Sequence, residues 1–462
     1  MNNQHHPIWK HSSFTGLIGV AQEDITPPAG IYFRNWGAAK TDTASGIHQR
    51  LTLTCLTFQS LAKDEPLVLI SADLGWWKNM EDERFLRHGI LETLSLQPSQ
   101  LMICFSHTHA GPSLCRDDAS KPGGKFIEQY LVHIRERAIH AIQAALSNAR
   151  AATLDWQYGK CNLATNRDLP GDGKDQFIVG FNARAVADDT LLVGRITDTQ
   201  GHIISTIVNY ACHPTTLAWD NLLISPDYVG TMRAVIESET QAPCLFLQGA
   251  SGELAPAEQY TGDTDIAEKH GRQIGHAALS TLASMLPCNT AISFNGIVES
   301  GASLGVWKRT ITQSCTELSA KMIDVQLPLK DLLSPAEIEK QWMACEDPVL
   351  KERLWRKLNV RKAVGDGDVA RVPLWMWKLG DSLLIGQPNE TYSAFQLELR
   401  KQFPANAVAV MNVVNGHIGY LPPEKLYDKD IYSAWQTPFA KGSLEILIST
   451  SGNLAHQMIK EK

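Results

Sequence analysis

The 462-residue sequence has no long run of apolar residues. No window approaches the roughly 18–20 apolar residues that cross a membrane, and the N-terminal stretch MNNQHHPIWKHSSFTGLIGV lacks the apolar core of a signal peptide. A block rich in lysine and arginine is also missing, and the net charge is −7. These absences argue against a membrane protein, a secreted protein and a nucleic-acid-binding protein.

Paired cysteines are missing as well. The nine cysteines are scattered along the chain, without any C-x-x-C spacing. Cys104, Cys212 and Cys244 lie in or beside apolar runs, and they are expected to be small buried hydrophobic residues. A reducing, cytoplasmic location is therefore expected.

Short apolar runs alternate with helical patterns along the chain. The runs are continuous, which predicts strands covered on both faces. They lie at 67–71, 101–105, 203–210, 244–247, 383–386 and 407–414. Helices are predicted over 125–148 and 264–286, and another at the capping box that begins at Ser334. The expected fold class is α/β, with α+β as the alternative: a layered mixed β-sheet core flanked by helices, with the active site at strand ends.

No internal repeat or low-complexity linker divides the sequence. We therefore predict a single domain over residues 1–462. The region 305–370 is richer in charged and helical sequence, and we expect it to be a helical insertion or a smaller lobe.

Each apolar run leads into polar or glycine-rich residues. The clearest case is LMICFSHTHAGPS at 101–113, where a predicted strand runs directly into His107 and His109. The residues that follow the other runs include Asp73, His213, Glu253, Glu390, His417 and Tyr420. Ligand sites in open α/β sheets lie outside the carboxyl ends of strands. These residues are therefore predicted to build one site.

The histidine pair is compatible with two roles. By itself, an H-x-H pair is more often an ordinary hydrogen-bonded pair at a strand end than a metal site. Neutral imidazole is nevertheless a good zinc ligand, and catalytic zinc takes three protein ligands and a water. His107 with His213 and Glu390 would form such a set. His109 can point the same way as His107 if the strand continues through them, whereas only one of the two coordinates if the chain turns.

Nine short motifs follow one another along the chain. They are GLIGVAQEDITPP (16–28), SADLG (71–75), SHTHAGP (106–112), NRD (166–168), CHPT (212–215), SPDYVG (225–230), FLQGASGE (246–253), PNET (388–391) and NGHIGYLPPEKLYDKDIY (415–432). In this order they resemble the neutral/alkaline non-lysosomal ceramidase family. The resemblance covers that family's catalytic domain nearly end to end.

The resemblance implies one zinc ion per chain and assigns its site. The ligands that it implies are His107, His213, Glu390 and Tyr420. The catalytic residues that it implies are His109 as a proton-transfer group, Arg167 as an arginine near the substrate, and Tyr432 as a hydrogen-bond donor to an oxyanion. Tyrosine is not a usual zinc ligand, but a cation can lower the pKa of a phenol as it does that of water.

Three features depart from the family pattern. Gly249 and Ala250 follow Gln248 where the ceramide hydrolases have Gln-Ser-Asn, so a hydroxyl expected near the reacting centre is missing, and Ser251 lies two residues further on. The sequence ends about 30 residues after Tyr432, which leaves no room for the family's C-terminal immunoglobulin-like domain. No signal sequence is visible. These departures predict a substrate other than ceramide.

The predicted function is zinc-dependent hydrolysis of a linear amide, by attack of zinc-bound water. The substrate is expected to be a small soluble compound rather than membrane ceramide, and neither nucleic acid nor a membrane is an expected partner. An ester or lactone hydrolase would use the same residues, and a zinc-dependent lyase or isomerase acting on a small polyhydroxy compound is the alternative from another class. A non-catalytic protein with structural zinc is disfavoured, because no cysteine falls among the four ligand positions. The sequence does not predict the oligomeric state.

Overall fold

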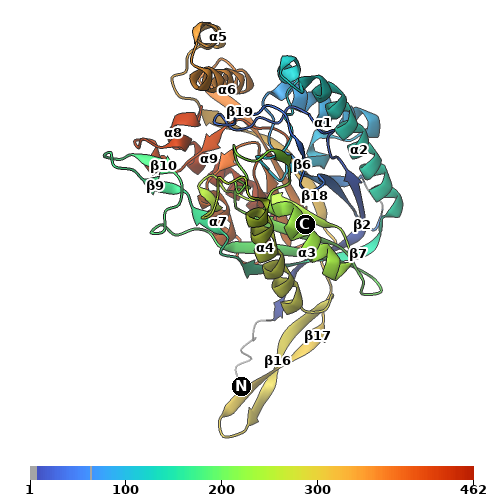
Figure 1. Cartoon of the computed structure of the whole chain (residues 1–462). Coiled ribbons are helices and arrows are strands. Elements are labelled where there is room, and N and C mark those ends of the chain that lie inside the picture. The colour runs from blue at the N-terminus through green and yellow to red at the C-terminus, as the bar shows by residue number, and fades with distance from the viewer. Residues whose placement is uncertain (1–7, 63–64, 462) are drawn as a thin grey trace.

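Two β-sheets pack face to face in the middle of the molecule, and helices cover their outer faces (Figure 1). This computed structural model describes residues 8–62 and 65–461. The interface between the sheets is apolar. Leu56 and Met102 of the larger sheet belong to the same buried cluster as Trp377 and Ala409 of the smaller one. The four layers are therefore helices, a large sheet, a small sheet and helices.

The larger sheet has eight strands. From one edge to the other they are β14 (Cys244–Gln248), β12 (Ile203–Tyr210), β11 (Thr190–Asp198), β7 (Arg150–Lys160), β2 (Ser12–Asp24), β4 (Thr52–Gln59), β5 (Leu67–Ala72) and β6 (Leu101–Phe105). The outermost pairs, β12 with β14 and β5 with β6, are parallel, and the strands between them are antiparallel. The predicted mixed sheet is confirmed.

The smaller sheet has four strands and is also mixed. Its strands, in order, are β18 (Leu318–Pro328), β19 (Val369–Leu379), β20 (Ser382–Gly386) and β22 (Ala407–Met411). Only β20 and β22 run parallel. The apolar runs are continuous because both sheets are inner layers, so even antiparallel strands are covered on both faces. The run 407–414 makes a shorter strand than expected, since Val413 turns the chain with a φ of 56°.

Helices cover both outer faces. The larger sheet is covered by α1 (Met80–Leu94), α2 (Ile127–Asn148), α3 (Tyr228–Thr240) and α4 (Thr264–Ser284), and the smaller sheet by α7 (Ala394–Gln402) and α9 (Ser443–Lys460). The helices predicted over 125–148 and 264–286 are confirmed to within two residues. Contact between α2 and β2 is so close that a Cβ atom on Gly19 would lie 1.8 Å from the carbonyl oxygen of Ala145. None of the described helices is long and apolar enough to cross a membrane.

The remaining elements are short. Two-residue and three-residue strands pair as β3 (Gly46–Ile47) with β13 (Leu223–Ile224), β8 (Ala164–Asn166) with β15 (Leu254–Pro256), β9 (Asp168–Pro170) with β10 (Phe177–Val179), and β21 (Glu390–Thr391) with β23 (Tyr420–Leu421). Helix α8 spans Tyr432–Gln436, and 3₁₀ helices lie at Pro98–Gln100, Arg116–Ser120, Gly124–Phe126 and Glu424–Leu426. The pair β21–β23 is the one that matters for the site.

The region 305–370 is only partly helical. At its start, β17 (Ser303–Ile311) forms a hairpin with the preceding strand β16 (Thr290–Glu299). This hairpin extends away from the body, and β16 also pairs with β1 (Trp9–Lys10) (Figure 1). Strand β18 belongs to the smaller sheet. The helical insertion is therefore α5 (Pro335–Ala344) and α6 (Pro348–Val364), which lie between the paired strands β18 and β19. The capping box at Ser334 is confirmed.

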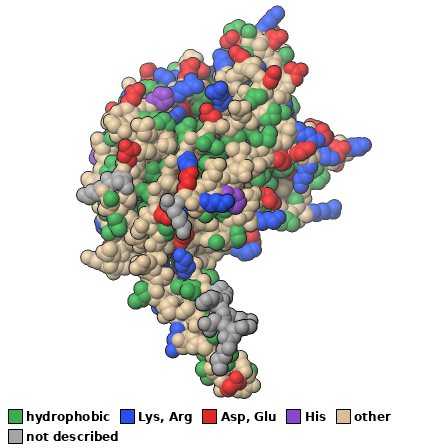
Figure 2. Space-filling view, turned by 180° about the vertical axis from the view of Figure 1, so that it is seen from behind, with side chains coloured by type: hydrophobic (Ala, Val, Ile, Leu, Met, Phe, Trp, Pro, Cys, Tyr) green, Lys and Arg blue, Asp and Glu red, His purple; other side chains and the backbone are tan. Residues whose placement is uncertain are grey.

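Figure 2 shows the face opposite to that of Figure 1. Lysine and arginine side chains of the described residues are interspersed with acidic ones over this face. The charges do not gather there into the broad basic patch that would attract a nucleic acid.

Candidate active site

The four predicted metal ligands come from the ends of strands in both sheets. His107 follows β6 and His213 follows β12, which are strands of the larger sheet. Glu390 lies after β20 and Tyr420 after β22, which are strands of the smaller sheet. Glu390 and Tyr420 then pair directly as the first residues of β21 and β23. The site therefore lies at one end of the interface between the two sheets.

Both histidines of the H-x-H pair reach the site although the chain turns between them. Strand β6 ends at Phe105, and His107 has a φ of 67°, in the left-handed region that a non-glycine residue rarely adopts. Side-chain nitrogens of His107, His109 and His213 nevertheless lie within 4.8 Å of one another. Strained backbone of this kind is concentrated at functional sites.

Backbone carbonyl groups fix the tautomers of His107 and His213. The Nδ1 atom of His107 lies 3.2 Å from the carbonyl oxygen of Gly75. The Nδ1 atom of His213 lies 2.7 Å from the carbonyl oxygen of Ser251 and 3.2 Å from that of Leu254. A carbonyl only accepts a hydrogen bond, so each Nδ1 carries the hydrogen. When such a ring is neutral, the lone pair is on its Nε2 atom, which faces the site.

Both lone pairs face one carboxylate oxygen. The Oε2 atom of Glu390 lies 2.9 Å from Nε2 of His213 and 3.5 Å from Nε2 of His107. Two acceptors at these distances repel each other unless a positive charge lies between them. Burial and the charge of Arg167 lower the pKa of His213 to about 4, so this ring does not supply a proton near neutral pH. The donor set could hold a metal cation.

The distances also suit zinc. Four ligands at the usual 2.0–2.1 Å in a tetrahedron are about 3.3 Å apart, and the two nitrogen–oxygen distances, 2.9 and 3.5 Å, lie on either side of this value. His107, His213 and Glu390 are all buried. The residues present therefore fit a zinc ion.

Arg167 acts on Tyr420 rather than on the cavity. Its Nη2 atom donates to the Tyr420 hydroxyl at 3.1 Å, and its Nε and Nη2 atoms donate to the carbonyl oxygen of Gly252. Burial raises the pKa of the Tyr420 hydroxyl well above its usual value and Glu390 raises it further, whereas Arg167 opposes the shift. Arg167 is not among the described residues that line the cavity. Its contacts favour a role in stabilising a phenolate over one in holding the substrate.

His109 has no polar partner. Both of its ring nitrogens are buried without a hydrogen bond from any described residue. The ring lies between two indoles, with its centroid 5.0 Å from that of Trp36 and 4.7 Å from that of Trp76. Burial, together with His107 and His213, lowers the pKa of His109 well below its usual value. An imidazole in this position is free to exchange a proton with a bound molecule.

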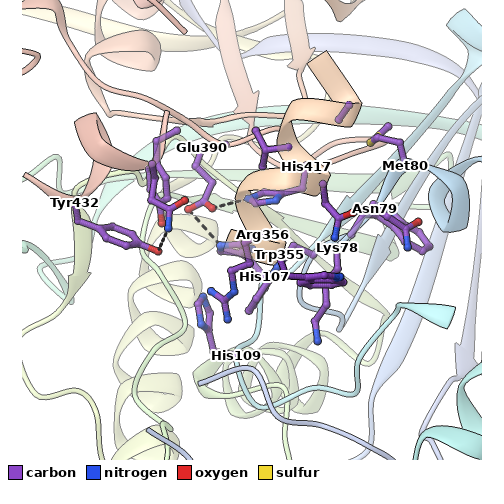
Figure 3. A pocket seen from close by; sticks show the side chains of 18 residues that line it. Lys78, Asn79, Met80, His107, His109, Trp355, Arg356, Glu390, His417 and Tyr432 are labelled. Atoms are coloured by element: carbon purple, nitrogen blue, oxygen red, sulfur yellow. Dashed lines mark hydrogen bonds and ion pairs between the residues drawn. The ribbon is translucent and has the colours of Figure 1, made fainter. Parts of the chain in front are cut away.

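One cavity of about 70 Å³ joins five of the seven predicted site residues, and neither His213 nor Arg167 is among the described residues that line it (Figure 3). His107, Glu390 and Tyr420 line it, together with His109 and Tyr432. The other described residues that line it are Trp76, Trp77, Lys78, Asn79, Met80, Trp355, Arg356, Asn359, Val360, Ala363, His417, Gly419 and Gln436. Five of these lie on α6, so the helical insertion forms one wall of the site.

His417 is a site residue to which the sequence assigned no role. Its Nε2 atom lies 2.8 Å from Oε1 of Glu390, the oxygen that faces away from His107 and His213. The signal was present, because His417 follows an apolar run just as the other site histidines do. The sequence contains no comparable indication that α6 lines the site.

The position that departs from the ceramidase motif lies away from the cavity. A Cβ atom on Gly249 would meet Ala211 and Gln396, each at 3.0 Å. Ser251 does not replace a hydroxyl at the centre either, because its Oγ atom accepts a hydrogen bond from Gln248 at 2.6 Å. The carbonyl of Ser251 instead orients His213. The altered motif is therefore not part of the cavity lining among the described residues.

Comparison with known proteins identifies the family of this chain. The family model described as neutral/alkaline non-lysosomal ceramidase, N-terminal, matches residues 17–257, which is more than half of the chain. The chain belongs to the neutral/alkaline non-lysosomal ceramidase family. The neutral ceramidase of Pseudomonas aeruginosa is 24% identical over 272 residues. The match covers 56% of this chain but only 40% of the length of that relative.

Solved ceramidase structures share the fold. The crystal structure of neutral ceramidase from Pseudomonas aeruginosa matches with a TM-score of 0.68 at 16% identity, over 97% of this chain and 75% of that chain. A ceramidase complexed with C2 matches with a TM-score of 0.69 at 15% identity, over 97% of this chain and 76% of that chain. The layered arrangement of sheets and helices is therefore that of the ceramidases.

Proposed function

We propose that this member of the ceramidase family is a hydrolase that cleaves a linear amide with one zinc ion per chain. The observation that carries the proposal is the pair of imidazole lone pairs of His107 and His213, directed at one oxygen of Glu390. Such an arrangement is unfavourable without a cation. Tyr420 would be the fourth ligand, supported by its hydrogen bond from Arg167. A bound zinc ion supplies a Lewis acid for the carbonyl group and lowers the pKa of water.

The surrounding residues have distinct tasks in this proposal. His109 takes a proton from the attacking water and returns it to the leaving amine, since its ring nitrogens have no other described partner. Tyr432 donates a hydrogen bond to the oxygen that becomes negative. It lies at the cavity with its ring centroid 5.6 Å from that of Tyr420. Arg167 orients Tyr420 and opposes the rise in the pKa of its hydroxyl.

The proposed substrate is a small soluble compound rather than membrane ceramide. Cavities for drug-sized ligands occupy roughly 300–1,000 Å³, whereas this cavity measures about 70 Å³. The small cavity supports a small substrate. The glycine at position 249 is weaker support, because Gly249 lies away from the cavity. A cytoplasmic location is part of the proposal and is supported by nine free cysteines, six of them buried.

The test combines metal analysis with a substrate screen. Protein purified without chelator should contain about one equivalent of zinc, and His213→Ala should lose both metal and activity. The screen compares short N-acyl amines, N-acyl amino acids and lactones with a long-chain ceramide in detergent. A folded wild-type protein without zinc would overturn the metal site. Preferential turnover of lactones would contradict the proposal that the substrate is an amide. A kcat/KM for ceramide of about 10⁴ M⁻¹s⁻¹ or more would contradict the proposal that the substrate is small and soluble.

A further inference from the structure

Helix α6 presents one face to the cavity. The residues of α6 that line it are Trp355, Arg356, Asn359, Val360 and Ala363. Spacings of three and four positions connect them, as between neighbours on a single helical face. Figure 3 shows the side chains of Trp355 and Arg356 near those of His107 and His109. What this face offers to a bound molecule therefore bears on the substrate.

The guanidinium group of Arg356 is held through one of its nitrogen atoms, and its other two nitrogens have no acceptor among the described residues. Its Nη2 atom donates to the carbonyl oxygen of Asn35 at 3.2 Å and to Glu352 at 2.5 Å. Asn35 in turn donates to the carbonyl oxygen of Gly111, in the loop that carries His109. Among the described residues, nothing accepts a hydrogen bond from Nε or Nη1 of Arg356. The guanidinium group is thus tied to the active-site loop while donors remain for a ligand.

Asn359 adds a second donor, one turn further along the helix. Its Nδ2 atom is buried, and no described residue accepts a hydrogen bond from it. A buried donor without an acceptor is unfavourable, and a ligand that brings an acceptor removes this cost. Asn359 and Arg356 line the same cavity. Together they form a surface that donates hydrogen bonds.

Among the described residues that line the cavity, none offers a free carboxylate to Arg356. Glu390 is the only carboxylate among the described lining residues, and its two oxygens already face His213 and His417. The other lining cation, Lys78, is neutralised by Asp118 at 3.0 Å. Glu352 pairs with Arg356, but both side chains are about 30% exposed, so water weakens this pair. The unused edge of the guanidinium group suits a carboxylate.

We propose that Arg356 and Asn359 form a carboxylate subsite, so that the substrate is a small amide with a negative charge beside the scissile bond. The inference rests on the proposed amide hydrolysis and names its substrate class. The carboxylate comes either from the amine side, as in an N-acyl amino acid, or from the acyl side, as in the monoamide of a dicarboxylic acid. Either kind of substrate would place its carboxylate against α6.

The experiment compares matched compounds with and without the charge. The zinc-loaded enzyme is assayed with N-acetylglycine, its uncharged analogue N-acetylglycinamide, and N-methylsuccinamate, which carries the carboxylate on the acyl side. At least one charged compound should exceed the uncharged one in kcat/KM by about 10- to 100-fold. Arg356→Gln should remove this advantage mainly through KM. Lys357→Gln removes an exposed positive charge from the next position of α6, outside the cavity, and should change nothing.

The outcomes separate this inference from the proposed function. Equal turnover of charged and uncharged compounds, or an equal loss for both in Arg356→Gln, overturns the carboxylate subsite and leaves amide hydrolysis intact. If no compound is hydrolysed, binding of N-acetylglycine and N-methylsuccinamate is measured by saturation-transfer NMR. Binding that Arg356→Gln abolishes and Lys357→Gln retains supports the subsite even then. Absence of binding to the wild-type protein overturns it.

Discussion

The two histidines of the 106–112 loop differ in what holds their rings. A carbonyl group orients His107 so that its Nε2 atom faces Glu390, whereas His109 has indoles on two sides and no polar partner. We therefore expect His109→Ala to retain zinc while kcat falls by about 10²- to 10⁴-fold. Metal analysis and steady-state kinetics on one preparation check this. Loss of zinc in this variant would make His109 a ligand instead.

His417 is expected to act on the metal through Glu390. Its Nε2 atom contacts Oε1 of that carboxylate, so Oε2 remains available to bind the ion. Residues that orient a ligand typically change metal affinity by about 10- to 100-fold. Replacement of His417 by Ala should weaken zinc binding by this factor in a competition with a chelator. His276→Ala, an exposed histidine on α4, provides the control. Unchanged affinity would leave His417 without this role.

At the scale of single residues, strand ends made much of the site predictable. His107, His213 and Glu390 follow continuous apolar runs, which identify buried strands, and strand ends converge in a layered fold. The sequence could not show that Arg167 reaches Tyr420, because 253 positions separate them and their hydrogen bond depends on how the two sheets pack. It could not show either that Gly249 faces Ala211 rather than the cavity.

Among the elements, α6 forms one wall of the cavity. Trp355 contributes the largest side chain that this helix places in the lining. Replacing Trp355 by Ala should enlarge the cavity and lower KM for amides with longer acyl chains, while KM for acetyl compounds stays constant or rises. The same series is measured with Trp342→Ala, a change in α5 outside the cavity. A KM profile unchanged by Trp355→Ala would show that α6 does not limit the substrate.

Strands were easier to predict than the α6 wall for a physical reason. Burial on both faces gives strands such as β5 and β6 a continuous apolar sequence, whichever way their neighbours run. Helix α6 has few buried side chains, among them Leu358 and Val364, so its sequence has only a weak periodic pattern. Its position depends on the hairpin β18–β19 that carries it and on the contact with Asn35. Neither is encoded within the helix itself.

At the scale of the whole molecule, the proposed metal site links the two sheets. His107 and His213 follow strands of the larger sheet, whereas Glu390 and Tyr420 follow strands of the smaller one. A zinc ion held by all four would therefore join the two inner layers at one end of their apolar interface. Without it, the lone pairs of His107 and His213 would face Glu390 uncompensated in a buried site. Metal binding should then contribute to the stability of the entire fold.

Metal removal should consequently lower the thermal stability of the wild-type protein. A ligand present at 1,000 times its Kd stabilises the native state by about 4 kcal/mol, so a chelator should shift Tm downwards by several degrees and added zinc should restore it. His213→Ala should unfold at a lower temperature and respond to neither treatment, because it removes a ligand from the larger sheet. Calorimetry with and without chelator measures both proteins. An equal response of wild type and His213→Ala would mean that the stabilising ion binds elsewhere, and no response in either would mean that the two sheets hold together without a metal.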